Sequence, residues 1–142
     1  MNQKTVTIET IKQYTKLTDM INEFIAECGG GSGIVNVFVQ HTTCAIKILE
    51  GEILLLSDIS CFLNELFPKQ KDYRHDVIEV RDVPVTERIN GFSHMRQLFF
   101  SSDASIPVKD GKMMLGQWQD VFLIEFDPIR GRDVIFTFWK ND

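Results

Sequence analysis

The sequence predicts an α+β fold in which two antiparallel β-sheets pack as a sandwich, with two or three helices at their flanks. The last third of the 142-residue chain consists mainly of short segments in which the residues of one face, or of both faces, are apolar. Such segments indicate antiparallel strands. Two longer segments, residues 18–28 and 52–67, carry apolar residues at helical spacing instead. Because these helices do not alternate regularly with the strands, we expect separate layers of sheet and helix.

The composition indicates a soluble folded protein that does not bind nucleic acid. A chain of 142 residues can bury one core and is short for two, so we expect a single domain over residues 1–142. The formal net charge of −5 is opposite in sign to that of most nucleic-acid binders. The start of the chain lacks a signal-peptide pattern, and no apolar run is long enough to span a membrane. Three scattered cysteines without a CxxC pair suggest reduced thiols and a cytoplasmic location.

The first half of the chain predicts strand, helix, and two more strands. Residues 4–9 alternate as a strand, and a helix follows over 18–28, with Thr18 or Asp19 at its N-cap. The glycine-rich run at 29–33 resembles a phosphate-binding loop only superficially. A P-loop follows a strand and precedes a helix, whereas here the order is reversed. The glycines therefore indicate a helix end.

The second predicted helix, over residues 52–67, has more apolar surface than one buried stripe requires. It ends before Pro68. The additional residues are Ile53 and Leu54, which either contact a partner subunit or belong to a wide core face. The expected buried stripe consists of Leu55, Ile59, Phe62, Leu63 and Leu66.

The second half of the chain predicts one short helix and several strands. The helix starts near Asn90 or Ser93, and Met95, Leu98 and Phe99 are expected to face inward. An Asp110-Gly111 pair predicts a tight hairpin between strands 104–108 and 112–115. Strand 121–127 and a turn over 128–131 then lead to a last strand, 133–139. That strand is apolar on both faces, so we expect it to be central or covered.

A polar corner joins the two strands within residues 35–50. His41 ends one apolar row, Glu50 ends the other, and Thr42 and Thr43 lie between them. Such a corner can hold a site. The alternative is that polarity simply returns where the strands meet water.

All three histidines of the chain lie in polar clusters away from apolar runs. They are His41, His75 and His94, and they come from three separate loops or strand ends. Three imidazoles make up the ligand count of a catalytic zinc-type site with an open position, and they also suit nickel, copper or iron. No local metal-binding motif accompanies them, so the alternative of three unrelated surface residues remains open at this point.

Several motifs in order resemble those of the YjbQ-like family, over residues 38 to 139. They are Gln40-His41-Thr42-Thr43 followed by Glu50; Tyr73-Arg74-His75-Asp76; Asn90-Gly91, Ser93-His94 and Arg96; Ser105-Ile106-Pro107-Val108 with Gly111; Leu115-Gly116-Gln117-Trp118-Gln119; and Glu125-Phe126-Asp127 with Arg130 and Arg132. Members of this family are often described as secondary thiamine-phosphate synthases. The chain departs from the family pattern at Lys47 and Leu49 and over residues 51–54.

The resemblance implies a common metal site formed by His41, His75 and His94. It also implies a homotrimer, whose subunit contacts would include Ile53, Leu54, Trp118 and Trp139. Because imidazole is a borderline ligand, the expected metal is a divalent ion, with zinc first among the candidates.

Two classes of function follow. The first is a synthase-like enzyme that acts on phosphorylated small molecules, with Arg74 and Arg96 as phosphate ligands and Arg88 or Arg130 as further candidates. The three histidines would then be catalytic, and Glu50 would act as a general base or orient a ligand. The second class is a metal-binding protein without synthase activity, either a phosphate-ester hydrolase or a binding module. The alternative role for each arginine is solvated surface charge.

Overall fold

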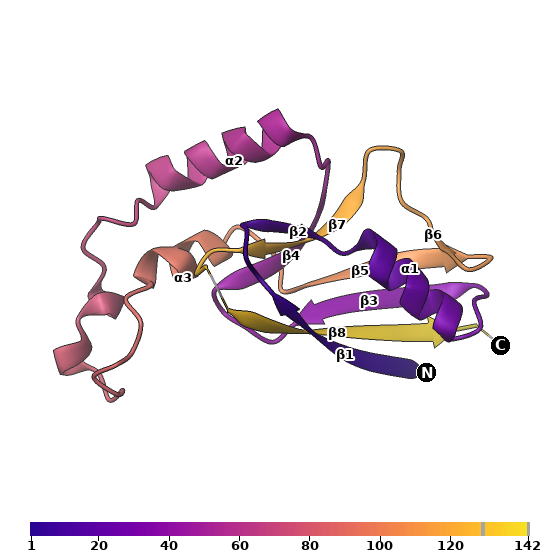
Figure 1. Ribbon diagram of the computed structural model, residues 1–142, viewed down its shortest axis with the longest axis horizontal. Coiled ribbons are helices and arrows are strands. Elements are labelled where there is room, and N and C mark those ends of the chain that lie inside the picture. Colours follow the sequence, from indigo (N-terminus) through magenta and orange to yellow (C-terminus); the bar gives the residue numbers. More distant parts are fainter. Residues whose placement is uncertain (129, 142) are drawn as a thin grey trace.

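The computed structural model describes residues 1–128 and 130–141 and confirms the expected α+β sandwich (Figure 1). None of its described helices has both the length and the apolar composition needed to cross a membrane. The elements are β1 (Asn2–Glu9), β2 (Tyr14–Lys16), α1 (Thr18–Glu27), β3 (Gly33–Val39), β4 (Cys44–Leu49), α2 (Ile53–Leu66), the 3₁₀ turns η1 (Arg74–Asp76) and η2 (Ile78–Val80), α3 (Gly91–Gln97), β5 (Asp103–Lys109), β6 (Lys112–Met113), β7 (Asp120–Glu125) and β8 (Gly131–Lys140).

The larger sheet has five strands in the order β1-β8-β3-β5-β6, and its neighbouring strands pair antiparallel. The last strand, β8, pairs with β1 on one side and with β3 on the other, which confirms its expected central position. The turn expected over residues 128–131 includes Ile129, which lies outside the described residues.

The smaller sheet, in the order β2-β7-β4, separates two apolar clusters. Val121 and Leu123 of β7 face the main core between the two sheets, and α1 contributes to this core. Phe122 and Ile124 face the opposite side, where Leu63 of α2 packs. The alternating side chains of β7 therefore bind both layers together, which explains why this strand is apolar on both faces.

The hairpin between β5 and β6 forms where the Asp-Gly pair predicted it. Asp110 and Gly111 have φ values of 50° and 79°. Positive φ at both central residues is typical of a type I′ turn, whose twist matches that of the flanking strands. The hairpin prediction is therefore confirmed.

Helix α1 occupies the expected range, but its start differs from the prediction. The N-cap position is Leu17, which has no capping side chain, so neither Thr18 nor Asp19 caps the helix. The Thr18 hydroxyl instead accepts from the Val121 N–H at 3.0 Å and donates to Asp120 Oδ1 at 2.8 Å. Thr18 thus ties the helix to β7, and this tertiary contact replaces a local cap.

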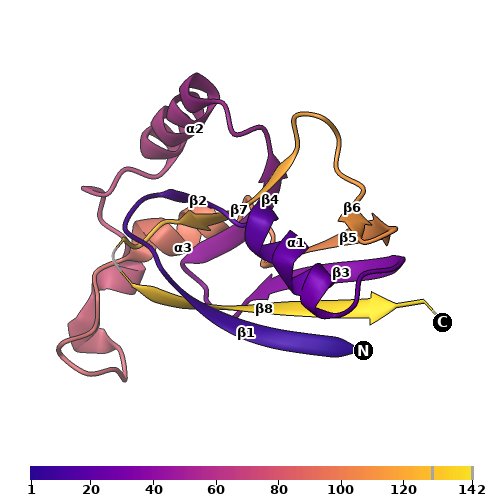
Figure 2. The ribbon, with the colours of Figure 1, turned by 45° about the vertical axis from the view of Figure 1, so that its right-hand side comes forward.

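Helix α2 forms as expected, but the prediction of its buried stripe was wrong. Only Leu63 of that stripe is buried, whereas Phe62 is 54% exposed. Figures 1 and 2 show α2 standing away from the larger sheet, and its apolar residues Ile53, Leu54, Leu55, Phe62 and Leu66 are exposed. The helix starts at Glu52, whose carboxylate accepts from the Leu54 and Leu55 N–H groups, each at 2.8 Å.

Helix α3 also turns a different face inward from the expected one. Leu98 and Phe99 are 70% and 57% exposed, and Met95 is exposed as well. The buried residues are Gly91, Phe92, Ser93 and Arg96. Ser93 on this face bonds to the Phe126 carbonyl just after β7, and Arg96 bonds to Asn64 and Phe67 at the end of α2.

Candidate functional site

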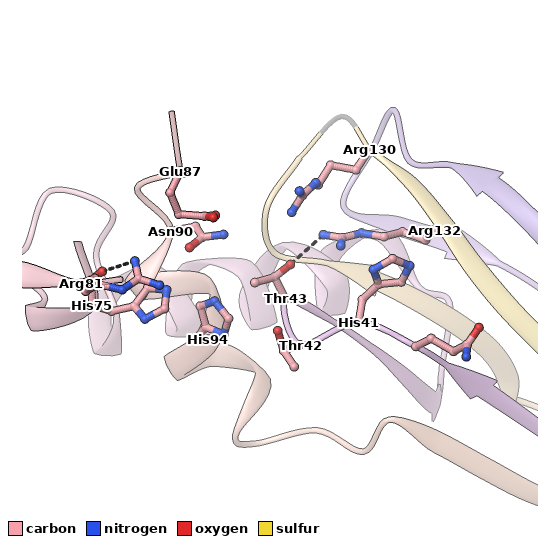
Figure 3. Close-up of a pocket in the computed structure, with 11 residues that line it drawn as sticks. His41, Thr42, Thr43, His75, Arg81, Glu87, Asn90, His94, Arg130 and Arg132 are labelled. Atoms are coloured by element: carbon pink, nitrogen blue, oxygen red, sulfur yellow. Dashed lines mark hydrogen bonds between the residues drawn. The ribbon is translucent and has the colours of Figure 1, made fainter. Parts of the chain in front are cut away.

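A pocket of about 320 Å³ opens where the β3–β4 corner, β8 and α3 meet, and all three histidines line it (Figure 3). One side, which we call the sheet wall, consists of Gln40, His41, Thr42, Thr43, Arg130 and Arg132. The other side, the helical wall, consists of His75, Arg81, Glu87, Asn90 and His94. The polar corner predicted at residues 41–43 therefore lines this pocket.

His41 is held on the sheet wall by the backbone of the neighbouring strand. Its Nε2 accepts from the Asp133 N–H at 3.1 Å. Because Nε2 acts as the acceptor, a neutral ring carries its proton on Nδ1. The remaining nitrogen is then a hydrogen-bond donor, and it could bind a metal ion only after losing its proton.

A buried ion pair supports the sheet wall from behind. Arg132 and Glu125 have side chains that are each 1% exposed, and two hydrogen bonds of 2.6 and 2.7 Å join them. Arg132 Nη2 also donates to Thr43 Oγ1 at 2.9 Å, as Figure 3 shows. Burial acts to lower the pKa of Arg132, but the hydrogen bonds and charge of Glu125 outweigh it and raise the pKa. The guanidinium is therefore a permanent cation that orients Thr43.

The helical wall brings His75 and His94 together. Their ring centroids are 4.4 Å apart, at an interplanar angle of 57°. The Asp76 carboxylate accepts from the Gly91 N–H at 2.8 Å, which joins η1 to the start of α3. A Cβ atom at Gly91 would lie 2.6 Å from Cβ of Tyr73, so only glycine permits this approach. The short distance between the two rings depends on that missing side chain.

Two further contacts fix α3 against the end of β7. The Ser93 hydroxyl donates to the Phe126 carbonyl at 2.6 Å, and Asn90 Nδ2 donates to Asp127 Oδ2 at 3.0 Å. The second bond leaves Asn90 Oδ1 buried and without a hydrogen-bond partner among residues 1–128 and 130–141. A buried acceptor without a partner is costly, so this oxygen is a ready contact for a donor or cation in the pocket.

The pocket favours the neutral forms of His41 and His94. Burial, followed by the nearby Arg132 charge, lowers the pKa of His41. Burial and the nearby His75 lower the pKa of His94, while Asp127 acts in the opposite direction. A neutral imidazole can accept a proton or bind a metal ion, whereas its protonated form can do neither.

The three imidazoles of the pocket do not meet at one point. Figure 3 shows His75 and His94 adjacent on the helical wall, with His41 across the pocket beside Arg132. The described part of the chain contains no group of three or more His, Cys, Asp or Glu residues arranged to hold a metal. The expected centre formed by His41, His75 and His94 therefore stays a prediction.

Of the other predicted site residues, Arg130 lines this pocket, whereas Glu50, Arg74, Arg88 and Arg96 do not. Glu50 is exposed beyond the end of β4 and lines a separate hollow with Trp118. Six strand residues at about 3.3 Å each carry it roughly 20 Å from the corner. Arg74 is exposed and is not among the residues that line the pocket. Arg96 is buried, and its guanidinium donates to Asn64 Oδ1 and to the Phe67 carbonyl.

Arg81 and Glu87 are the pocket residues that the sequence did not reveal. Both belong to the segment between η2 and α3, which lacks regular structure apart from turns. Arg81 Nη1 donates to the His75 carbonyl at 2.7 Å. The sequence indicates these two residues only weakly, because they are simply charged residues on either side of the loop around Pro84.

Two archaeal proteins of the same family resemble this chain along most of its length. A protein of Methanothermobacter thermautotrophicus is 36% identical over 118 residues, which cover 83% of this chain and 76% of that protein. A protein of Archaeoglobus fulgidus is 33% identical over 132 residues, which cover 92% and 95% of the two chains. Both are called UPF0047 proteins.

Solved structures agree with the fold. A hypothetical protein of Aeropyrum pernix matches with a TM-score of 0.87 and 27% identity over 99% of this chain and 100% of that one. A YbjQ-like protein of unknown function from Sulfolobus solfataricus matches with a TM-score of 0.86 and 26% identity over 99% and 97% of the two chains. The model of the family described as UPF0047 protein YjbQ-like matches residues 2–141. This chain therefore belongs to the UPF0047 family of YjbQ-like proteins.

Proposed function

We propose that this protein is an enzyme acting on a phosphorylated small molecule bound in the pocket between the sheet wall and the helical wall. The observation that carries the proposal is the meeting of three histidines and three arginines around one cavity of about 320 Å³. Cavities of this size suit small molecules, and arginines suit phosphate oxygens.

Arg81 is the strongest candidate for phosphate binding. Arg132 is neutralised by Glu125, and Arg130 pairs with Asp127 at 3.1 Å. Arg81 forms no ion pair with any described residue, and its one hydrogen bond goes to a neutral carbonyl. Asp127 is shared between Arg130 and Arg88, so Arg81 is the arginine of the pocket that has no carboxylate partner among the described residues. Its positive charge is therefore available for an anionic ligand.

The reaction that the family resemblance suggests is thiamine-phosphate synthesis, in which a pyrimidine pyrophosphate is joined to a thiazole phosphate and pyrophosphate is released. His75 and His94 would accept or donate protons, or would hold a divalent ion together with Asn90 Oδ1. His41 would join them as a ligand once its Nε2 released the Asp133 N–H. A bound ion, with zinc first among the candidates, would act as a Lewis acid on the leaving pyrophosphate. Free thiols at the described cysteines and the absence of a membrane-spanning described helix fit a cytoplasmic enzyme.

The alternative is a protein that binds metal and phosphate without synthase activity, either as a phosphate-ester hydrolase or as a binding module. The observation that favours it is the place of Glu50. The carboxylate expected near the histidines lies elsewhere in this chain. A hydrolase needs only a phosphate contact, an activated water and a proton acceptor.

Pyrophosphate release from the two thiamine precursors tests these alternatives. We expect release that requires both precursors, and we expect Arg81→Gln to lower kcat/KM by about 10²–10³-fold, as loss of a donor to transition-state charge usually does. The control Arg74→Gln removes an exposed arginine that precedes His75 and lies outside the pocket lining. It is expected to change the rate by less than about twofold. Release from the pyrimidine pyrophosphate alone would support the hydrolase, and binding without release would support the binding module.

A homotrimer is part of the same proposal. Ile53 and Leu54 are 78% and 70% exposed on α2, and Trp118 is 66% exposed. Apolar groups of this size are usually covered in stable assemblies. Light scattering at micromolar concentration is expected to give three times the mass of one chain.

Charge on the apolar α2 surface should disrupt that assembly. The double variant Ile53→Glu/Leu54→Glu is expected to shift the mass to that of one chain without unfolding it, because both side chains are exposed. The control is Val80→Glu, which places a charge at another apolar residue that is 80% exposed. A monomer mass for the wild type would overturn the trimer.

A further inference from the structure

A second cavity lies on the other side of α3, and its lining shares no residue with the histidine pocket. Its volume is also about 320 Å³. The β1–β2 loop, the C-terminal end of α2, α3 and the end of β7 surround it. No part of the function proposed above uses this cavity.

Three cations line this cavity: Lys12, Lys69 and Arg96. None of them forms an ion pair with a described residue. Arg96 is 7% exposed, and its Nε and Nη2 donate to Phe67 and Asn64. Its Nη1 donates to no acceptor in the described ranges. Burial and these hydrogen bonds fix the Arg96 guanidinium in the wall of the cavity, and its Nη1 group still has N–H donors for a ligand.

The two side-chain amides of the cavity add further donors. Asn64 Oδ1 accepts from Arg96 at 2.7 Å, so this amide oxygen is engaged. Gln13 Oε1 lies 3.0 Å from the Ser60 hydroxyl, whose one proton it shares with the Leu56 carbonyl at 2.8 Å. The Nδ2 and Nε2 groups remain, and an NH₂ group can only donate.

The one carboxylate in the lining is neutralised. Glu125 Oε1 accepts from Arg132 Nη2 and the Asp127 N–H, at 2.6 and 2.8 Å. Glu125 Oε2 accepts from Arg132 Nε and the Thr10 hydroxyl, at 2.7 and 2.6 Å. The positive charges of the cavity thus face no free negative charge within the described lining.

Aromatic rings form the remaining part of the wall. Phe92 and Phe126 are 5% and 2% exposed and line the cavity. Arg96 Cζ lies 4.9 Å and Lys69 Nζ 5.8 Å from the centroid of the Phe92 ring. Both cations are therefore held beside an apolar surface by cation–π contacts.

We propose that this cavity is a second binding site, which takes a phosphate monoester that carries a small apolar or aromatic group. The phosphate binds to Lys12, Lys69 and Arg96, and the apolar group packs against Phe92. The cavity offers three cations and two amide NH₂ groups that can only donate. These groups match a doubly charged phosphate ligand better than a singly charged carboxylate ligand. The site is independent of the reaction proposed for the histidine pocket.

Titration of ¹⁵N-labelled protein with phenyl phosphate tests this site by NMR. Shifts are expected at the amides of Gln13, Asn64 and Phe92. The double variant Lys12→Gln/Lys69→Gln is expected to weaken binding at these reporters about tenfold or more, because it removes two charge-assisted contacts. The control Lys71→Gln/Lys109→Gln changes two exposed lysines outside the lining and is expected to leave the affinity within about twofold.

Two further measurements decide the ligand class and the independence of the site. Benzoate is expected to bind more weakly than phenyl phosphate, and equal affinity would overturn the assignment to a phosphate. Arg81→Gln in the histidine pocket is expected to leave the shifts at Phe92 unchanged. The proposal is wrong if these three reporters do not respond in the wild type, or if the two double variants bind alike.

Discussion

Replacing Glu125 with alanine is expected to destabilise the protein by about 3–5 kcal/mol, which makes it among the most damaging single changes in the chain. The Arg132 side chain is 1% exposed and would lose both hydrogen bonds to its carboxylate partner. A guanidinium cannot release its proton to escape burial, so it would remain as an uncompensated charge. The Thr10 hydroxyl would lose its bond to Glu125 as well.

Urea unfolding followed by circular dichroism measures this loss. The matched control is Glu50→Ala. Glu50 is an exposed glutamate that follows β4, at the opposite end of the β4–β7 pairing from Glu125. That change is expected to alter the free energy of unfolding by less than about 0.5 kcal/mol. Similar losses in both variants would show that the buried pair has no special part in stability.

The second large effect is expected from replacing His75 with alanine. We expect this variant to lose bound metal and to lower turnover by about 10²–10⁴-fold, the range of a proton-transfer group. His75 lies at the pocket surface in a short 3₁₀ turn, and its ring packs against His94. The fold is therefore expected to persist, with an unchanged circular dichroism spectrum.

Metal content per protein chain, measured by mass spectrometry after purification without chelator, is the primary readout. Arg74→Ala changes the preceding residue of the same 3₁₀ turn, which is exposed and outside the pocket lining. It is expected to retain metal and activity. If His75→Ala keeps its full metal content, or if it unfolds, the idea of a shared histidine centre is wrong.

Most strands and the His41 corner could be predicted because both follow from local patterns. Alternation predicted the longer strands but not the short β2, and the apolar faces of the last segment predicted the central place of β8. Arg130 and Arg132 of the sheet wall were indicated only by the family resemblance. The corner at His41 was predictable because it interrupts an apolar row. Periodicity could not show that α2 would have few neighbours, since it identifies an apolar face and does not identify what covers that face.

Charged residues were the least predictable part of the site. Arg96 was expected to contact ligand in the same site as the histidines, yet it packs on Phe92 and lines a different cavity. Arg81 and Glu87 were not expected, because the segment that carries them has no period from which a direction can be inferred. Side-chain direction outside regular structure depends on tertiary contacts such as the bond from Arg81 to the His75 carbonyl.

The two walls of the histidine pocket differ in how they are attached to the rest of the molecule. Arg132 of β8 pairs with Ile8 of β1, and His41, which follows β3, accepts from the backbone of β8, so strands of the sandwich hold both residues. Strands in a packed core are usually among the last parts of a protein to open. His75 and Arg81 belong to a segment whose backbone bonds are short-range turns, joined to α3 through Asp76 and Gly91. Partial opening of that segment should cost less free energy than global unfolding. The distance between the histidines on opposite walls is then a variable that a ligand can change while both sheets stay intact.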